Sequence, residues 1–279
     1  MNKILLTSFL FSVLIAQDDF VGDVFDRGKV NYSDRTIQAT GIGFIPLNVI
    51  NAGQARRNAL IIAKGDALRL LIEIVNGVNL TSETTIAGAM FDDEINMQIQ
   101  GAIRGARQVG DPKYLSDTSV EVTYEVSMSL ISRILLPMDD GSPTLSYAEA
   151  QAGAAPPSAG TSAPISGSTT GLIIDARGVG ARPAMSPKIV DQNGGVVYGP
   201  SSFTRDYAIK FGVAGYSKDI ETAKSDPRVV GNPLIVRGIG VQGSNGTDIV
   251  VANGDAATIR RAESSGKVLS SCKVMIILD

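Results

Sequence analysis

NAGQARRNALIIAKGDALRLLIEIVNG, residues 51–77, is a long segment whose apolar residues recur with the period of an α-helix. On a helical projection its alanine, leucine, isoleucine and valine side chains cover well over half of the circumference. A narrow polar strip remains, and Arg69 and Glu73 within it are spaced as an i,i+4 ion pair. So wide an apolar surface predicts cover from neighbouring elements on two sides.

Small residues refine this prediction. The alanines at positions 55, 59, 63 and 67 lie on one face of the predicted helix, so they allow a sheet or a second helix to approach closely. Gly65 costs roughly 1 kcal/mol relative to alanine inside a helix, which favours close packing at that point. Gly77 is expected to end the helix in the left-handed conformation.

The flanking segments predict a small sheet. RTIQATGIGFIPL, residues 35–47, reads as a strand in which Gly41 and Gly43 allow a bend or a close approach. A second helix is expected over 88–106, with the acidic triplet 92–94 in its first turn, where the helix dipole favours negative charge. Residues 119–130 alternate between apolar and polar side chains as a half-buried strand does, and 107–109 form a short partner strand. The result is an α+β unit with two helices on one face of an antiparallel sheet.

Four segments of this unit resemble a known family. They are ATGIG at 39–43, ARRNALIIAKGDALRLLIEIVNGVNLTSET at 55–84, IQGAIRGARQV at 99–109 and SVEVTYEVSM at 119–128. They are similar to the small outer-membrane lipoproteins of the Lpp-twenty type, to the N-terminal domain of flagellar assembly protein T and to flagellar protein P. The resemblance implies association with the outer membrane and with rings or disks around the flagellar basal body, and it implies no catalytic residues. This chain lacks the lipid-bearing cysteine of the lipoprotein members.

Composition shifts along the chain predict its domain organisation. Residues 1–16 carry Lys3 and an apolar run from Ile4 to Ala16, as a secretory signal peptide does. The α+β unit follows over 17–136. Residues 137–171 are rich in proline, alanine, glycine and serine and read as a linker. Residues 172–279 form a second α+β domain, for which we expect a mostly antiparallel sheet with a hairpin at Asn193-Gly194.

Composition also excludes several kinds of site. The 279 residues contain no histidine, so Ser-His-Asp and Cys-His catalytic groups and histidine zinc sites are absent. Cys272 is the single cysteine and lies in the apolar run CKVMIIL, which indicates a buried thiol. A net charge of −3 without a basic run argues against nucleic acid as a partner. No later segment is long and apolar enough to span a membrane, although peripheral attachment remains open.

Few residues stand out as functional candidates. We identify no catalytic, cofactor-binding or metal-ligating set, and three G-x-G turns (41–43, 178–180 and 238–240) lack the rest of a nucleotide-binding motif. Arg56 and Arg57 fall in the predicted first helical turn, where cations oppose the dipole. They are therefore our candidates for contact with an acidic partner, and extension of both side chains into water is the competing interpretation.

These observations favour a non-catalytic, exported protein that acts by oligomeric assembly in the cell envelope. Its location would be the periplasm, the outer membrane or the outside of the cell, and its partners would be further copies of itself and envelope or flagellar proteins. The alternative is a periplasmic protein that binds or hydrolyses a small ligand or glycan with its second domain, using carboxylates such as Asp175 and Asp255 as acid and base.

Overall fold

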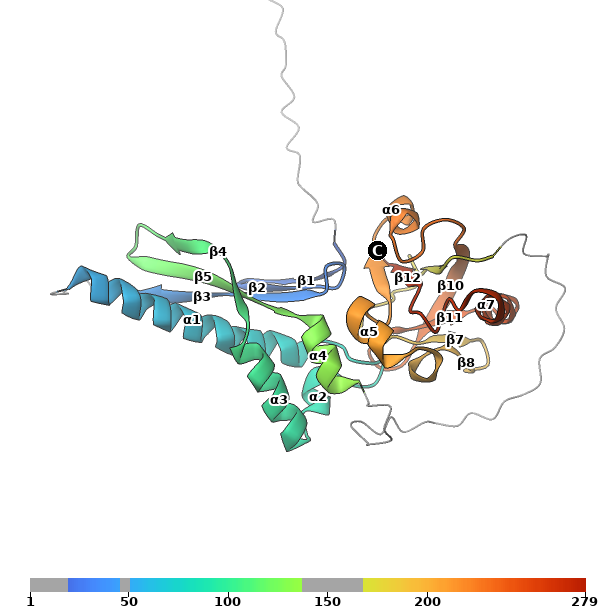
Figure 1. The fold of residues 1–279 in the computed structure, drawn as a ribbon, viewed down its shortest axis with the longest axis horizontal. Coiled ribbons are helices and arrows are strands. Elements are labelled where there is room, and N and C mark those ends of the chain that lie inside the picture. The colour runs from blue at the N-terminus through green and yellow to red at the C-terminus, as the bar shows by residue number, and fades with distance from the viewer. Residues whose placement is uncertain (1–19, 46–50, 137–167) are drawn as a thin grey trace, which may run out of the picture.

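The computed structural model describes residues 20–45, 51–136 and 168–279, which form two units (Figure 1). The N-terminal unit comprises residues 20–45 and 51–136, and the C-terminal unit comprises residues 168–279. The predicted signal peptide and nearly all of the predicted linker lie outside the described residues. Described structure resumes at residue 168, and Thr169 is already buried against the C-terminal unit.

The N-terminal unit is a long helix laid across an antiparallel sheet. Its strands pair in the order β1-β2-β3-β5-β4, and each pairing is antiparallel. They are β1 (Gly22–Phe25), β2 (Gly28–Asn31), β3 (Thr36–Phe44), β4 (Arg107–Tyr114) and β5 (Ser119–Ser127). Helix α1 (Ala52–Gly77) covers one face, beginning after Asn51, whose side chain accepts a hydrogen bond from Gln54 N. The predicted long helix on the sheet and the two longest strands of this unit are confirmed. The second predicted helix packs on α1 and α4 instead of on the sheet, and the β1–β2 hairpin was not predicted.

The predicted close approach of α1 to the sheet is confirmed at Gly41 and Gly43. A Cβ atom on Gly41 would lie 2.0 Å from the carbonyl oxygen of Ala63, and one on Gly43 would lie 2.0 Å from that of Ala59. The alanines at 55, 59, 63 and 67 are buried along this seam. Glycine on the strand and alanine on the helix thus bring the two backbones together.

Two predictions about glycines in α1 are wrong. Nothing lies within 4 Å of a Cβ built on Gly65, so that glycine faces open space instead of a close neighbour. Gly77 stays in the helix, and Val78 ends it in an extended conformation because the following loop turns directly into the C-terminal unit.

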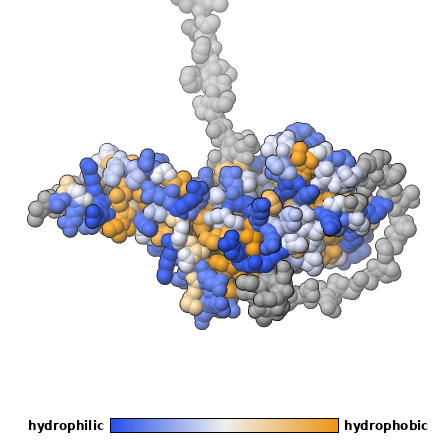
Figure 2. Space-filling view, viewed as in Figure 1, coloured by the Kyte–Doolittle hydropathy of each residue, from blue (hydrophilic) through white to orange (hydrophobic). Residues whose placement is uncertain are grey.

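Helix α1 is also less covered than its apolar surface predicted. Helices α2 (Ile86–Ala89) and α3 (Asp93–Arg104) contact α1 beyond its sheet face. Over its N-terminal half, however, Ile61 and Ile62 remain 62% and 56% exposed. Figure 2 shows apolar side chains at the surface over this half of α1.

Two element boundaries differ from the predictions. The helix expected over 88–106 is two helices, because the Asp92 side chain accepts hydrogen bonds from the N–H groups of Glu94 and Ile95 and so starts α3 afresh. The strand expected to reach residue 130 ends at Ser127, which caps helix α4 (Met128–Leu135) through its hydroxyl. The placement of acidic residues in the first turn of α3 is confirmed.

The C-terminal unit has a mixed sheet with helices on both faces. Its strands pair in the order β8-β7-β11-β10-β6-β12-β9. They are β6 (Leu172–Asp175), β7 (Ile189–Asp191), β8 (Val196–Tyr198), β9 (Gly215–Ser217), β10 (Leu234–Gln242), β11 (Asp248–Val251) and β12 (Val274–Ile277). The helical elements are the 3-10 turn η1 (Pro200–Ser202), α5 (Arg205–Phe211), α6 (Ile220–Ser225) and α7 (Asn253–Gly266).

The mixed α and β composition is confirmed, but the prediction of a mostly antiparallel second sheet is wrong. The pairs β10–β6, β11–β7, β12–β6 and β12–β9 are parallel, while β10–β11 and the predicted hairpin β7–β8 are antiparallel. Both faces of β6 are buried: Leu172 and Ile174 pack into the main core, and Ile173 packs with Ala223 of α6 on the other side. Strands buried on both faces have continuous apolar runs, which are typical of parallel sheets.

Candidate functional site

The two units share one hydrophobic core and a dense hydrogen-bonded junction. The loop 79–85 after α1 is held between segments of the C-terminal unit. Met185 N donates to Asn79 O at 2.9 Å, Ser186 N donates to Leu80 O at 2.8 Å, and Asn245 N donates to Ser82 O at 2.8 Å. The loop therefore fastens the C-terminal end of α1 to the C-terminal unit.

A buried carboxylate lies at the centre of this junction. The Ser82 hydroxyl donates to Asp248 Oδ2 at 2.6 Å, and Lys188 N donates to Asp248 Oδ1 at 3.0 Å. Burial raises the pKa of Asp248, and the two hydrogen bonds only partly offset that effect. Neither Ser82 nor Asp248 stood out in the sequence. The capping-type residues of the loop 79–85 were the available signal.

Two arginines hold the C-terminal end of α5 from both units. Arg35 donates to the carbonyl oxygens of Lys210 and Ile209 at 2.9 and 3.1 Å. Arg228 donates to the carbonyl oxygens of Phe211, Gly212 and Cys272. Burial, together with the charge of Arg228, lowers the pKa of Arg35 to about 10, so the Arg35 guanidinium stays charged at neutral pH and complements the negative end of the helix.

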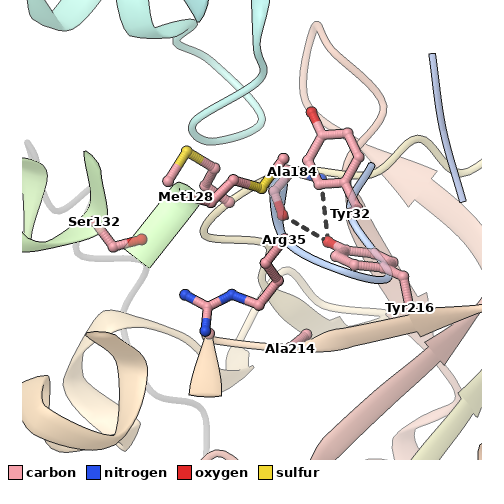
Figure 3. Close-up of a pocket in the computed structure, with 9 residues that line it drawn as sticks. Tyr32, Arg35, Met128, Ser132, Ala184, Ala214 and Tyr216 are labelled. Carbon is pink, nitrogen blue, oxygen red and sulfur yellow. Dashed lines mark hydrogen bonds between the residues drawn. The ribbon is translucent and has the colours of Figure 1, made fainter. Parts of the chain in front are cut away.

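A small cavity lies beside Arg35 at the junction (Figure 3). Tyr32, Met128 and Ser132 line it from the N-terminal unit, and Ala184 and Tyr216 line it from the C-terminal unit. The Tyr216 hydroxyl donates to Ala184 O at 2.8 Å and accepts a hydrogen bond from Ala184 N at 3.1 Å. The cavity has a volume of about 10 Å³, which accommodates one water molecule at most. This cavity is a feature of the junction and is too small for a substrate.

A larger, open groove lies between α1 and the strands β4 and β5. Its volume is about 230 Å³. We call it the α1 groove; its lining residues are Arg57, Leu60, Ile61, Lys64, Gln108, Pro112, Val122 and Tyr124. The lining combines two cations with apolar surface and contains no carboxylate, so it suits a segment that is both apolar and acidic.

The structure places both predicted contact arginines near this groove. Because α1 begins at Ala52, Arg56 and Arg57 lie in its second turn, so the expected placement in the first turn is wrong and the opposition to the dipole is weaker. Both side chains are exposed. Arg56 lies over the ring of Tyr114 at 5.8 Å, whereas Arg57 lines the groove. Lys64, also in the groove, lies 5.5 Å from the ring centroid of Tyr124.

Asp175 and Asp255, the carboxylates suggested as acid and base, are not joined to each other by any hydrogen bond among the described residues. Asp175 ends β6 and accepts two hydrogen bonds from the guanidinium group of Arg177, at 2.8 Å each, and one from the Arg177 backbone N–H at 3.3 Å. Arg177 holds the pKa of Asp175 below its ordinary value, against the effect of burial. Asp255 lies in the first turn of α7, which packs on β7, β8 and β10. A general acid requires a raised pKa, and the pair with Arg177 opposes this.

The glycines of the two later G-x-G turns, 178–180 and 238–240, lie where the backbone bends or the strand register shifts. Gly178 and Gly180 have φ values of +77° and +73° in the loop after β6, and Gly238 and Gly240 flank a register shift between β10 and β11. Gly178 and Gly180 thus form a bend after a strand end, whereas Gly238 and Gly240 lie within β10. Among the described residues, no group of three cysteine or acidic side chains is arranged as metal ligands. In that same part of the chain, no helix has the length and apolar character needed to cross a bilayer.

Comparison with known proteins bears on the C-terminal unit. Residues 171–279 match the model of a family described as the second domain of Tp0624 from Treponema pallidum. The comparison with curated proteins gave no match. The matched range begins one residue before β6 and includes every strand of the second sheet. The resemblance of residues 35–132 to the lipoprotein and flagellar family stays a prediction.

Proposed function

We propose that this chain is a non-catalytic, exported envelope protein that acts by oligomeric assembly, in a flagellar-associated ring or disk or in another structure associated with the outer membrane. The observation that carries the proposal is the α1 groove, an open, cationic and apolar hollow on the chain's longest described helix. Exposed apolar surface bordered by polar groups is typical of protein–protein contact sites. The sequence of residues 1–16 supports export.

The joined units also support a structural role. A buried hydrogen bond between Ser82 and Asp248 and the hydrogen bonds from Arg35 to α5 cross the junction. A body assembled in this way presents its surfaces in a constant relative orientation, which is what a repeating assembly requires. The alternative function, binding or hydrolysis of a small ligand or glycan, has less support because Asp175 is engaged by Arg177.

The test is the mass of the purified protein, lacking residues 1–16, measured by sedimentation velocity over a wide range of concentrations. We expect an oligomer that grows with concentration, and crosslinking in cells that recovers either further copies of the chain or envelope proteins. A monomer at every concentration, with no partner crosslinked in cells, would refute the proposal. Hydrolysis of a glycan by the purified protein would favour the alternative.

A further inference from the structure

The α1 groove is an exposed cationic surface. Within the described residues, neither Arg57 nor Lys64 forms an ion pair, although the Asp66–Arg69–Glu73 group on the same helix is fully paired. The apolar part of the lining includes Ile61, which is 62% exposed. A cavity of about 150 Å³ is large enough for benzene, so the 230 Å³ groove has room for an aromatic side chain.

The opposite kind of surface lies at the corner between α2 and α3. Phe91 is 91% exposed, and Met97, on the first turns of α3, is 69% exposed. Asp93 and Glu94 lie beside them in the first turn of α3, and neither carboxylate has an ion-pair partner among the described residues. Figure 1 shows this end of α3 projecting away from the sheet. We call Phe91, Asp93, Glu94 and Met97 the acidic corner.

We propose that the acidic corner of one copy of this chain docks in the α1 groove of the next copy. Phe91 would enter the apolar part of the groove, and Asp93 and Glu94 would lie against Arg57 and Lys64. The charges of the two surfaces are complementary, and each surface combines its charges with exposed apolar groups, as expected of two patches that desolvate each other.

This contact deepens the proposed function and rests on it, since it names the surfaces through which copies assemble. The groove and the corner are different patches, so the contact is heterologous: each copy offers one free groove and one free corner. Contacts of this kind produce closed rings when the rotation between copies closes, and open filaments when it does not.

Charge reversal tests the contact in the full chain lacking residues 1–16. The groove variant carries Arg57→Glu and Lys64→Glu, and the corner variant carries Asp93→Lys and Glu94→Lys. In each variant the groove and the corner carry charges of the same sign, so two copies of the same variant repel each other at this contact. We therefore expect the concentration for half-assembly to rise at least about tenfold in sedimentation velocity. In an equimolar mixture, the acidic groove meets the basic corner and the native groove meets the native corner, so assembly should return.

Two controls complete the experiment. Lys210→Glu with Lys267→Glu makes the same change in net charge as the groove variant, on exposed residues of the C-terminal unit, and should leave assembly unchanged. Circular dichroism confirms that each variant is folded. Phe91→Ala, with all charges intact, should weaken assembly. If the native chain assembles and the folded variants assemble equally well, or if the mixture of the two variants fails to assemble, this contact is wrong while the proposed function stands. If the native chain stays monomeric at every concentration, this contact is wrong, and the proposed function falls as well when crosslinking in cells recovers no partner.

Discussion

Replacing Gly41 by alanine tests the closest contact in the fold. The added methyl carbon would lie 2.0 Å from the carbonyl oxygen of Ala63 and 2.3 Å from the backbone nitrogen of Ala67. Both atoms belong to the backbone of α1, so no rotation of a flexible side chain relieves the clash. The helix must instead move away from β3.

The size of that movement gives the magnitude of the effect. Cβ atoms essentially never approach other heavy atoms closer than 3.0 Å, so the 2.0 Å contact requires a displacement of about 1 Å. A gap of about 0.5–1 Å already forfeits a quarter to a half of the dispersion energy across an interface. The buried seam from Ala55 to Val75 would be affected along its length. We expect a loss of free energy of unfolding of about 3 kcal/mol or more, at the upper end for overpacked cores.

Urea unfolding followed by far-ultraviolet circular dichroism measures this loss, and Gly65→Ala is the matched control. Gly65 lies in the same helix with nothing within 4 Å of the added Cβ, so alanine should stabilise the chain by up to about 1 kcal/mol through helix propensity. The two glycine-to-alanine changes are thus expected to have opposite signs. A Gly41→Ala chain as stable as the native one would refute the close helix–strand packing.

Three further predictions concern buried polar groups. Ser82→Ala removes the hydroxyl that donates to Asp248 at 2.6 Å, so urea unfolding should show a loss of about 1.5–3 kcal/mol, and an unchanged stability would mean that the junction does not depend on this bond. Asp248→Asn tests the raised pKa of Asp248. Because the pKa is higher in the folded state, ionisation of Asp248 lowers the native free energy of unfolding as the pH rises from the ordinary to the raised pKa, and asparagine does not ionise. In unfolding curves between about pH 4 and 7, the free energy of unfolding of the variant should therefore rise relative to that of the native chain as the pH rises. A variant that instead gains stability relative to the native chain as the pH falls would contradict the raised pKa. Cys272 is fully buried and burial raises its pKa, so a thiol reagent should modify it slowly in the native protein and rapidly in urea; equal rates in both would contradict its burial.

Features set by local periodicity were predictable. The 3.6-residue repeat of 51–77 identified α1, and the alternation of 119–127 identified β5, because each pattern depends on which side chains share one face of one element. Small residues carried further information: Gly41 and Gly43, read with the alanine series, predicted the close approach of strand and helix. Arg57 was singled out from its charge and position, and it lines the α1 groove.

Strand direction required the tertiary structure. An apolar run such as that of β6 indicates that both faces of the strand are buried. The parallel pairing of β6 with β10 and β12, however, depends on the crossover path of the chain. The acidic corner could also not be identified from the sequence pattern alone. The triplet 92–94 was placed in the first turn of a helix that was expected to begin at residue 88, but the exposure of Phe91 beside it follows from how α2 and α3 turn away from the sheet.

The chain's own pattern of residues was sufficient for helix α1, for strands β3 and β5 and for the buried cysteine, since each follows from neighbours within a few turns or pleats. The junction was decided by folding in three dimensions. Ser82 and Asp248 are 166 residues apart, and Arg35 is 174 residues from Ile209, yet both pairs are hydrogen-bonded. No periodicity links residues so distant. They meet because the loop after α1 and the turn after β2 pack against the C-terminal unit, where buried polar groups must find partners.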